Sequence, residues 1–179
     1  MNSSTAALTR PPSQTHGLLN DLEPQIEQTD DGFTQLRPLP KKILLADDDP
    51  GIREMLGRVL ESENYEVVSA KNGNEAAAKF VSWRPDLVLL DLNMPDRDGW
   101  SAFRFMAAAH PSLRVIIITA RPNQSEKANE LGADAIMEKP LNLPALLEAM
   151  KGLLAESEAT RSLRITSQTF KTACLPRQK

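Results

Sequence analysis

The segment Pro85-Asp-Leu-Val-Leu-Leu-Asp-Leu-Asn-Met-Pro95 places four apolar residues, 87–90, directly before Asp91. Short runs that are apolar on both faces and rich in branched side chains predict buried strands of a parallel sheet. Three similar runs also lead to polar groups: 43–46 to Asp47-Asp48, 115–118 to Thr119, and 135–137 to Lys139. Because functional groups gather at the carboxyl ends of parallel strands, we expect these side chains to converge on one pocket.

Helical patterns and one further strand separate these runs. Residues 66–70 predict the second strand in sequence, and caps, turns and apolar spacing predict five helices within residues 50–60, 74–81, 98–109, 125–131 and 142–154. Five strand–helix pairs imply an α/β domain, a doubly wound five-stranded parallel sheet with helices on both faces.

The ends of the chain differ in composition from its centre. Residues 1–40 are rich in Pro, Ser, Thr, Gln and Asp, so we expect a disordered N-terminal extension before a domain at 41–155. A short amphipathic turn around residues 18–26 predicts either transient helix or a docking motif. Residues 156–179 are polar and basic, and they predict a flexible tail too short for a DNA-binding domain.

Composition limits the classes of partner and compartment. The formal net charge is −3, so the chain lacks the overall positive charge typical of nucleic-acid-binding proteins, and we expect no nucleic-acid partner. Cys174 is the only cysteine, which excludes an intramolecular disulfide and fits a reducing cytoplasm. No apolar stretch approaches the roughly 18 residues that a membrane span needs. We therefore expect a soluble cytoplasmic protein without membrane insertion.

Four segments together resemble the receiver domain of response regulators in two-component signalling. They are Lys42-Ile-Leu-Leu-Ala-Asp-Asp-Asp49, residues 85–95 with Asp98-Gly99, Val115-Ile-Ile-Ile-Thr-Ala120, and Gly132-Ala-Asp-Ala-Ile-Met-Glu-Lys-Pro140. The resemblance implies the flavodoxin-like strand order 2-1-3-4-5 and a cis Lys139-Pro140 peptide. Because residues 156–179 are too few for an attached output domain, we expect a stand-alone receiver.

The acidic groups predict a cation site. Neighbouring carboxylates at one edge would repel one another, and Mg²⁺ prefers such hard oxygen ligands. The resemblance assigns Asp48 and Asp91 as direct ligands, Asp47 as a ligand acting largely through water, and Asn93 as a ligand through its backbone carbonyl. It makes Asp91 the phospho-acceptor and nucleophile, assisted by the Thr119 hydroxyl and the Lys139 ammonium. No further cofactor is expected.

These residues predict a phosphorylation-dependent receiver that takes a phosphoryl group from a histidine kinase or phosphotransfer protein and signals through a partner protein. Self-phosphorylation and slow self-dephosphorylation are its only expected reactions, so it is not expected to be a turnover enzyme. The alternative is a scaffold or adaptor that binds its partner regardless of phosphorylation. A third hypothesis gives the basic tail an anionic contact. An EF-hand loop does not fit residues 91–102, because Ala102 stands where that loop requires Glu.

Overall fold

The computed structural model describes residues 26–28, 34–36, 39–95, 98–167 and 169–178. The chain forms two compact units, residues 1–39 and 40–179. In the first, β1 (Ile26–Gln28) and β2 (Thr34–Leu36) form an antiparallel pair, with Ile26 opposite Leu36. The described residues 26–28 and 34–36 are thus in strands, and the disorder expected for residues 1–40 stays a prediction. The amphipathic turn predicted at residues 18–26 lies outside the described residues except for Ile26.

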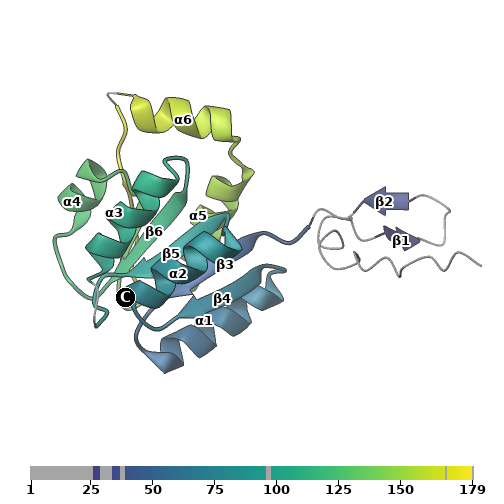
Figure 1. Ribbon diagram of the computed structural model, residues 1–179, viewed down its shortest axis with the longest axis horizontal. Helices are drawn as coiled ribbons and strands as arrows, with labels where there is room; N and C mark the ends of the chain where they lie inside the picture. Colours follow the sequence, from purple (N-terminus) through teal and green to yellow (C-terminus); the bar gives the residue numbers. More distant parts are fainter. Residues whose placement is uncertain (1–25, 29–33, 37–38, 96–97, 168, 179) are drawn as a thin grey trace, which may run out of the picture. The chain divides into compact units, whose positions relative to one another are not determined.

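The second unit is built on one parallel sheet (Figure 1). Its strands are β3 (Lys42–Ala46), β4 (Glu66–Ala70), β5 (Leu87–Asp91), β6 (Arg114–Thr119), β7 (Ala135–Glu138) and β8 (Ala173–Leu175). They are arranged in the order β4-β3-β5-β6-β7-β8. The first five strands of this unit therefore have the predicted order 2-1-3-4-5, and β8 adds a sixth strand that was not predicted.

Helices cover both faces of this sheet, as predicted. They are α1 (Pro50–Ser62), α2 (Gly73–Trp83), α3 (Gly99–Ala109), α4 (Ser125–Glu130) and α5 (Leu143–Ala155). One apolar core joins the sheet to α2, α3 and α4, and Trp100 and Phe103 are buried in it as packing residues. The other core joins the sheet to α1 and α5. In β3, β5, β6 and β7, alternate apolar residues enter opposite cores, which explains why these four strands are apolar on both faces.

Side-chain caps fix where the helices that follow the strands begin. Asp49 accepts hydrogen bonds from the amides of Gly51 and Ile52, and Pro50 is the first residue of α1. Asn72 and Asn142 cap α2 and α5 in the same way. Asp49 is thus the helix cap that the sequence predicts. Within the described residues, no helix is long and apolar enough to cross a bilayer.

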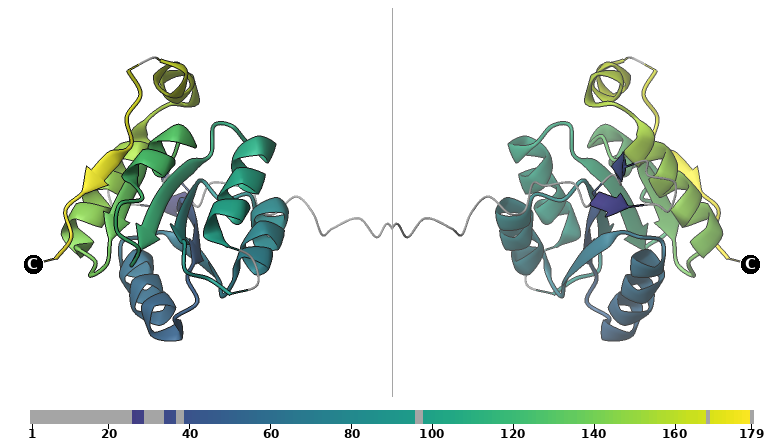
Figure 2. Two further views of the ribbon diagram at one scale, coloured as in Figure 1. Left: turned by 90° about the vertical axis from the view of Figure 1, so that its left-hand side faces the viewer. Right: turned by 90° about the vertical axis from the view of Figure 1, so that its right-hand side faces the viewer.

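The segment after residue 155 forms secondary structure, in contrast to the flexible tail that the sequence predicts. Helix α6 (Glu158–Thr166) follows α5, and the chain then returns as β8 beside β7. Figure 2 shows β8, in yellow, at the edge of the sheet next to the end of the chain. Three basic residues of this segment, Arg161, Arg164 and Arg177, form ion pairs with acidic residues of the domain.

Polar contacts hold α6 in place, which is the physical reason for the wrong prediction. Arg161 is 1% exposed and donates hydrogen bonds to Asp134 and to the backbone carbonyls of Ser112 and Leu113. Arg164 binds Asp134 at 2.6 Å. These partners precede β6 and β7, so α6 lies at the amino ends of those strands. The buried residue of α6 is Arg161 rather than an apolar side chain, so the sequence of this helix looks like a solvated tail.

Candidate functional site

The predicted site residues come from four neighbouring strands. Asp47 and Asp48 follow β3, Asp91 ends β5, Thr119 ends β6, and Lys139 follows β7. These strands are parallel and adjacent, so their carboxyl ends form one edge of the sheet. Asp91 is in register with Ile118, directly before Thr119, and Thr119 is in register with Glu138, directly before Lys139. The sheet thereby places residues up to 92 positions apart in the sequence at one edge.

The lysine joins the two buried carboxylates. Nζ of Lys139 lies 2.8 Å from Oδ2 of Asp91 and 2.9 Å from Oδ2 of Asp47. The other oxygen of each carboxylate accepts a hydrogen bond from the backbone amide two residues later: Asp49 donates to Asp47 at 2.9 Å and Asn93 to Asp91 at 3.0 Å. Both acids are thus fixed in orientation. The side chain of Lys139 remains 18% exposed, so the pocket is open to solvent on its side.

Burial and charge act in opposite directions on this group. Burial raises the pKa of Asp47, and the charge of Asp91 adds to that effect, whereas the hydrogen bond from Lys139 partly offsets it. For Lys139, burial lowers the pKa, but the hydrogen bonds to Asp91 and Asp47 outweigh burial and raise it above its ordinary value. The lysine is therefore a firmly protonated cation between two acids.

The three carboxylates fit a divalent cation. Asp47, Asp48 and Asp91 each offer an oxygen, and these oxygens all lie within 4.8 Å of one another. Asp48 is exposed, while Asp47 and Asp91 are 1% and 2% exposed. A cluster with one open side suits Mg²⁺, which keeps several waters and prefers oxygen ligands. Asn93 is half-buried beside the cluster, and its contact here is the amide hydrogen bond to Asp91.

Thr119 is fully buried, and its hydroxyl oxygen accepts a hydrogen bond from the amide of Arg121 at 3.0 Å. The hydroxyl hydrogen is therefore available for another acceptor. The backbone amide of Lys139 donates to the carbonyl of Thr119 at 2.8 Å, so the two residues are tied together. The Lys139–Pro140 peptide bond is cis, as predicted.

Two further residues shape the pocket, and the sequence did not identify their roles. A Cβ atom at Gly99 would lie 2.3 Å from the carbonyl oxygen of Asp91, so only glycine fits there. Arg53, on the first turns of α1, donates to the carbonyls of Asp47 and Asp48 at 2.7 and 2.9 Å. The dipeptide Asp98-Gly99 in the matched segment was a sequence signal for the role of Gly99. No such signal was present for Arg53, because helices commonly carry arginine on their outer face.

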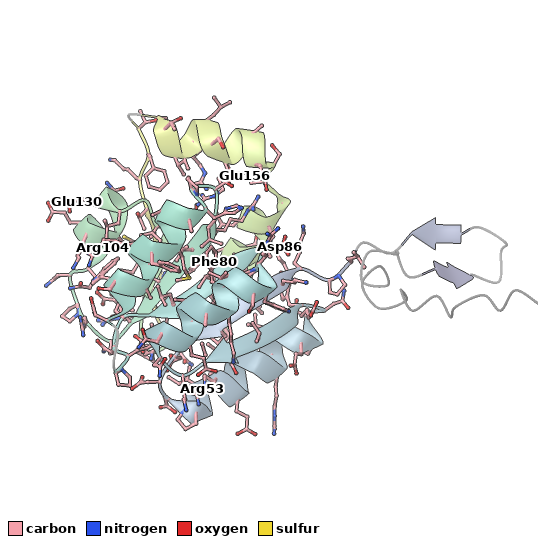
Figure 3. The ribbon with its side chains drawn as sticks, viewed as in Figure 1. Arg53, Phe80, Asp86, Arg104, Glu130 and Glu156 are labelled. Carbon is pink, nitrogen blue, oxygen red and sulfur yellow. The ribbon has the colours of Figure 1, made fainter. Side chains whose placement is uncertain are left out.

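The pocket and the α6 network lie at opposite ends of the sheet. Figure 3 labels Arg53, beside the pocket loop, and Glu156, which precedes α6, and it shows them far apart on the second unit. Arg53 contacts residues that follow β3, whereas Glu156 accepts from Arg164 at 2.9 Å. The acidic pocket is therefore separate from the cluster of arginine residues around Asp134.

Together, a parallel α/β sheet and an acidic pocket with one lysine at its carboxyl edge define a flavodoxin-like domain of the receiver class. Residues 43–151 match the response regulator receiver domain family, and the chain belongs to that family. Receiver domains are signalling modules of two-component response regulators. The match covers the pocket residues and all five predicted strands.

Known relatives agree with this assignment. Response regulator MprA of Mycolicibacterium vanbaalenii is 40% identical over 118 residues, which cover 65% of this chain and 51% of MprA. Transcriptional regulatory protein TrcR of Mycobacterium tuberculosis is 33% identical over 138 residues, which cover 73% of this chain and 54% of TrcR. The chain thus spans about half the length of these curated relatives.

A solved structure gives the same fold. The response regulator TrrA of Thermotoga maritima, crystallised in complex with Mg²⁺ and beryllium fluoride, has a TM-score of 0.59 and 36% identity. The similarity covers 63% of this chain and 98% of the TrrA chain. The aligned part therefore spans nearly the whole TrrA chain.

Proposed function

We propose that this chain is a phosphorylation-dependent receiver that accepts a phosphoryl group on Asp91 from a histidine kinase or phosphotransfer protein. The observation that carries this proposal is the ion pair of 2.8 Å between the Lys139 ammonium and the Asp91 carboxylate, beside two further acids. An isolated buried carboxylate would be costly, whereas the Asp91 carboxylate is held by the Asn93 amide and paired with the Lys139 ammonium, which is itself partly exposed. The domain then signals through a partner protein.

The reaction follows from the chemistry of a carboxylate nucleophile. A carboxylate oxygen of Asp91 attacks the phosphorus atom, the bond from phosphorus to the donor's histidine nitrogen breaks, and the electron pair stays on that nitrogen. The product is an acyl phosphate. The transferring group carries negative charge on its equatorial oxygens, so positioned cations and hydroxyl donors stabilise it. Lys139 supplies the cation and Thr119 the hydroxyl.

Asp47, Asp48 and Asp91 would hold Mg²⁺, with the backbone carbonyl of Asn93 as a fourth protein ligand. When bound, the ion supplies positive charge to the acceptor carboxylate and to the phosphoryl oxygens. The cluster of oxygens within 4.8 Å supports this assignment. The complex of TrrA with Mg²⁺ and beryllium fluoride supports it by analogy.

Labelling by a small phosphodonor tests the assignment. With Mg²⁺ and acetyl phosphate, the wild-type chain should acquire one acid-stable, base-labile phosphoryl group, measured by intact mass. Asp91→Asn should abolish the label because an amide cannot form the acyl phosphate, and Asp48→Ala should require more Mg²⁺ for the same rate. Glu130→Gln, an acid-to-amide change at an exposed position on α4, is the control and should label normally.

The outcome separates the two hypotheses of function. Label that persists on Asp91→Asn would refute this acceptor. A folded wild-type chain that takes no label would favour the phosphorylation-independent scaffold. One relative is named a transcriptional regulatory protein, and our proposal of a protein partner concerns the receiver unit alone.

A further inference from the structure

Residues 172–178, here named the strap, run along the outer edge of β7. Strand β8 within the strap pairs in parallel with β7, from Ala173 opposite Ala135 to Leu175 opposite Met137. Before β8, the Thr172 amide donates to Oδ1 of Asn129 at 2.9 Å and its hydroxyl to the Ala133 carbonyl at 2.7 Å. The strap therefore begins at the amino end of β7 and runs towards the pocket.

The far end of the strap contacts the residues on both sides of Lys139. Arg177 forms an ion pair with Glu138 at 3.5 Å, and the amide of Gln178 donates to the carbonyl of Pro140 at 3.0 Å. A groove of about 750 Å³ lies between Pro176–Gln178 on one side and residues 139–144 with α1 on the other. The segment 138–140 thus faces the acidic pocket through Lys139 and the strap through its two neighbours.

The strap is weakly held compared with α6. Ala173 and Cys174 are exposed, and Leu175 is half-buried against the second core. The side chains of the Arg177–Glu138 pair are 64% and 37% exposed, and such pairs contribute only about 0–1 kcal/mol. Segments with few buried apolar contacts open at the low end of the free-energy range. The strap can therefore detach while Arg161, which is 1% exposed, keeps α6 in place.

We propose that the strap is an intramolecular occupant of the β7 edge that is released when Asp91 carries a phosphoryl group. This inference rests on the function proposed above. The Lys139 ammonium contacts Oδ2 of Asp91, and phosphoryl oxygens would lie further from the sheet than this atom. Lys139 follows the new charge, and its backbone displaces Glu138 and Pro140 from their contacts with Arg177 and Gln178.

Release has a structural consequence at the edge of the sheet. The strap covers the backbone groups of Ala135, Ile136 and Met137 on their outer side. Uncovered backbone N–H and C=O groups form a surface to which an extended segment can add as a further strand. The strap occupies this edge in the unphosphorylated chain. Because the strap stays attached to the domain through α6, its effective concentration near β7 is high, and it can pair with β7 again once the phosphoryl group is lost.

Hydrogen exchange on the full chain tests the release. The chain is compared with Mg²⁺ alone and with Mg²⁺ plus beryllofluoride, which occupies an aspartate carboxylate in place of a phosphoryl group. Amide exchange of residues 172–178 is measured by mass spectrometry, and bound beryllofluoride is measured by ¹⁹F NMR. Exchange in the strap should accelerate by at least about fivefold, the lower end of usual coupling between sites. Exchange in α6 should stay unchanged.

A second experiment measures beryllofluoride affinity in variants of the strap and of α6. Leu175→Ser should weaken the contact of the strap with the core. Because coupling between two sites acts equally in both directions, this variant should bind beryllofluoride more tightly than wild type. Leu163→Ser changes the same residue type at a position on α6 that is 74% exposed, and it should leave binding unchanged. A bound ¹⁹F signal with unchanged strap exchange, or with equal affinity in Leu175→Ser, refutes the release alone. Absence of the bound signal refutes the acceptor assignment and the release with it.

Discussion

Replacing Arg161 with alanine tests whether α6 is a structural part of the receiver unit. The Arg161 guanidinium donates to the carboxylate of Asp134 and to the carbonyls of Ser112, at 2.8 Å, and Leu113. Asp134 is itself fully buried at its side chain, and its second oxygen accepts from the Val115 amide at 2.8 Å. The substitution therefore removes one partner of a buried charge and leaves the buried carbonyl of Leu113 and the half-buried carbonyl of Ser112 without this donor.

The expected loss of stability follows from this geometry. Removing one partner of a buried ion pair costs about 3–5 kcal/mol. Arg164 also binds Asp134, at 2.6 Å, and this ion pair is retained in the variant. We therefore expect a loss at the lower end of this range, about 3 kcal/mol. For a unit of this size, that loss lowers the thermal midpoint by about 6–12 °C.

Thermal and urea unfolding of the full chain, followed by circular dichroism, measure this loss. Leu163→Ala on the same helix is the matched control, because Leu163 is 74% exposed and its truncation should change stability by less than about 0.5 kcal/mol. If Arg161→Ala were as stable as this control, the buried network would not hold α6, and the C-terminal segment would be the dispensable tail that its composition suggests.

Two further predictions concern the pocket backbone and the response to acid. Gly99→Ala should slow acetyl phosphate labelling by about tenfold or more, because its Cβ would lie 2.3 Å from the Asp91 carbonyl oxygen and must displace it. Gly152→Ala, whose added Cβ would meet no neighbouring element within 4 Å, should label normally; equal rates in both variants would contradict the steric argument. The hydrogen bond from Arg164 lowers the pKa of Glu156 from its ordinary 4.5, so this carboxylate stabilises the fold above that pH, and the contribution is lost as the pH falls through the lowered pKa. Unfolding midpoints measured from pH 7 to pH 2 should therefore fall less steeply in Glu156→Gln than in wild type, and parallel curves would refute the role of this pair.

Much of the pocket could be predicted because its determinants are local in sequence. Each of Asp47, Asp91 and Thr119 directly follows or ends a strand with an uninterrupted apolar run, and strand direction alone places such residues at one edge. The helix cap at Asp49 was also predictable, since Asp followed by Pro favours the start of a helix. The contact between Gly99 and the Asp91 backbone was not, because it joins the first residue of α3 to the last residue of β5, and their approach is set by how α3 packs on the sheet.

The sequence by itself determined the parallel α/β sheet, its helices and the residues of the acidic edge, because alternating apolar runs and turn residues encode these features over short distances. Only the tertiary structure decided that the segment after residue 155 forms α6 and β8. Arg161 finds its partners 27 to 49 positions earlier in the chain, and β8 pairs with a strand about as far away. Such polar, long-range contacts leave no periodic pattern in the sequence, so a segment that looks solvated becomes the last helix and the edge strand of the domain.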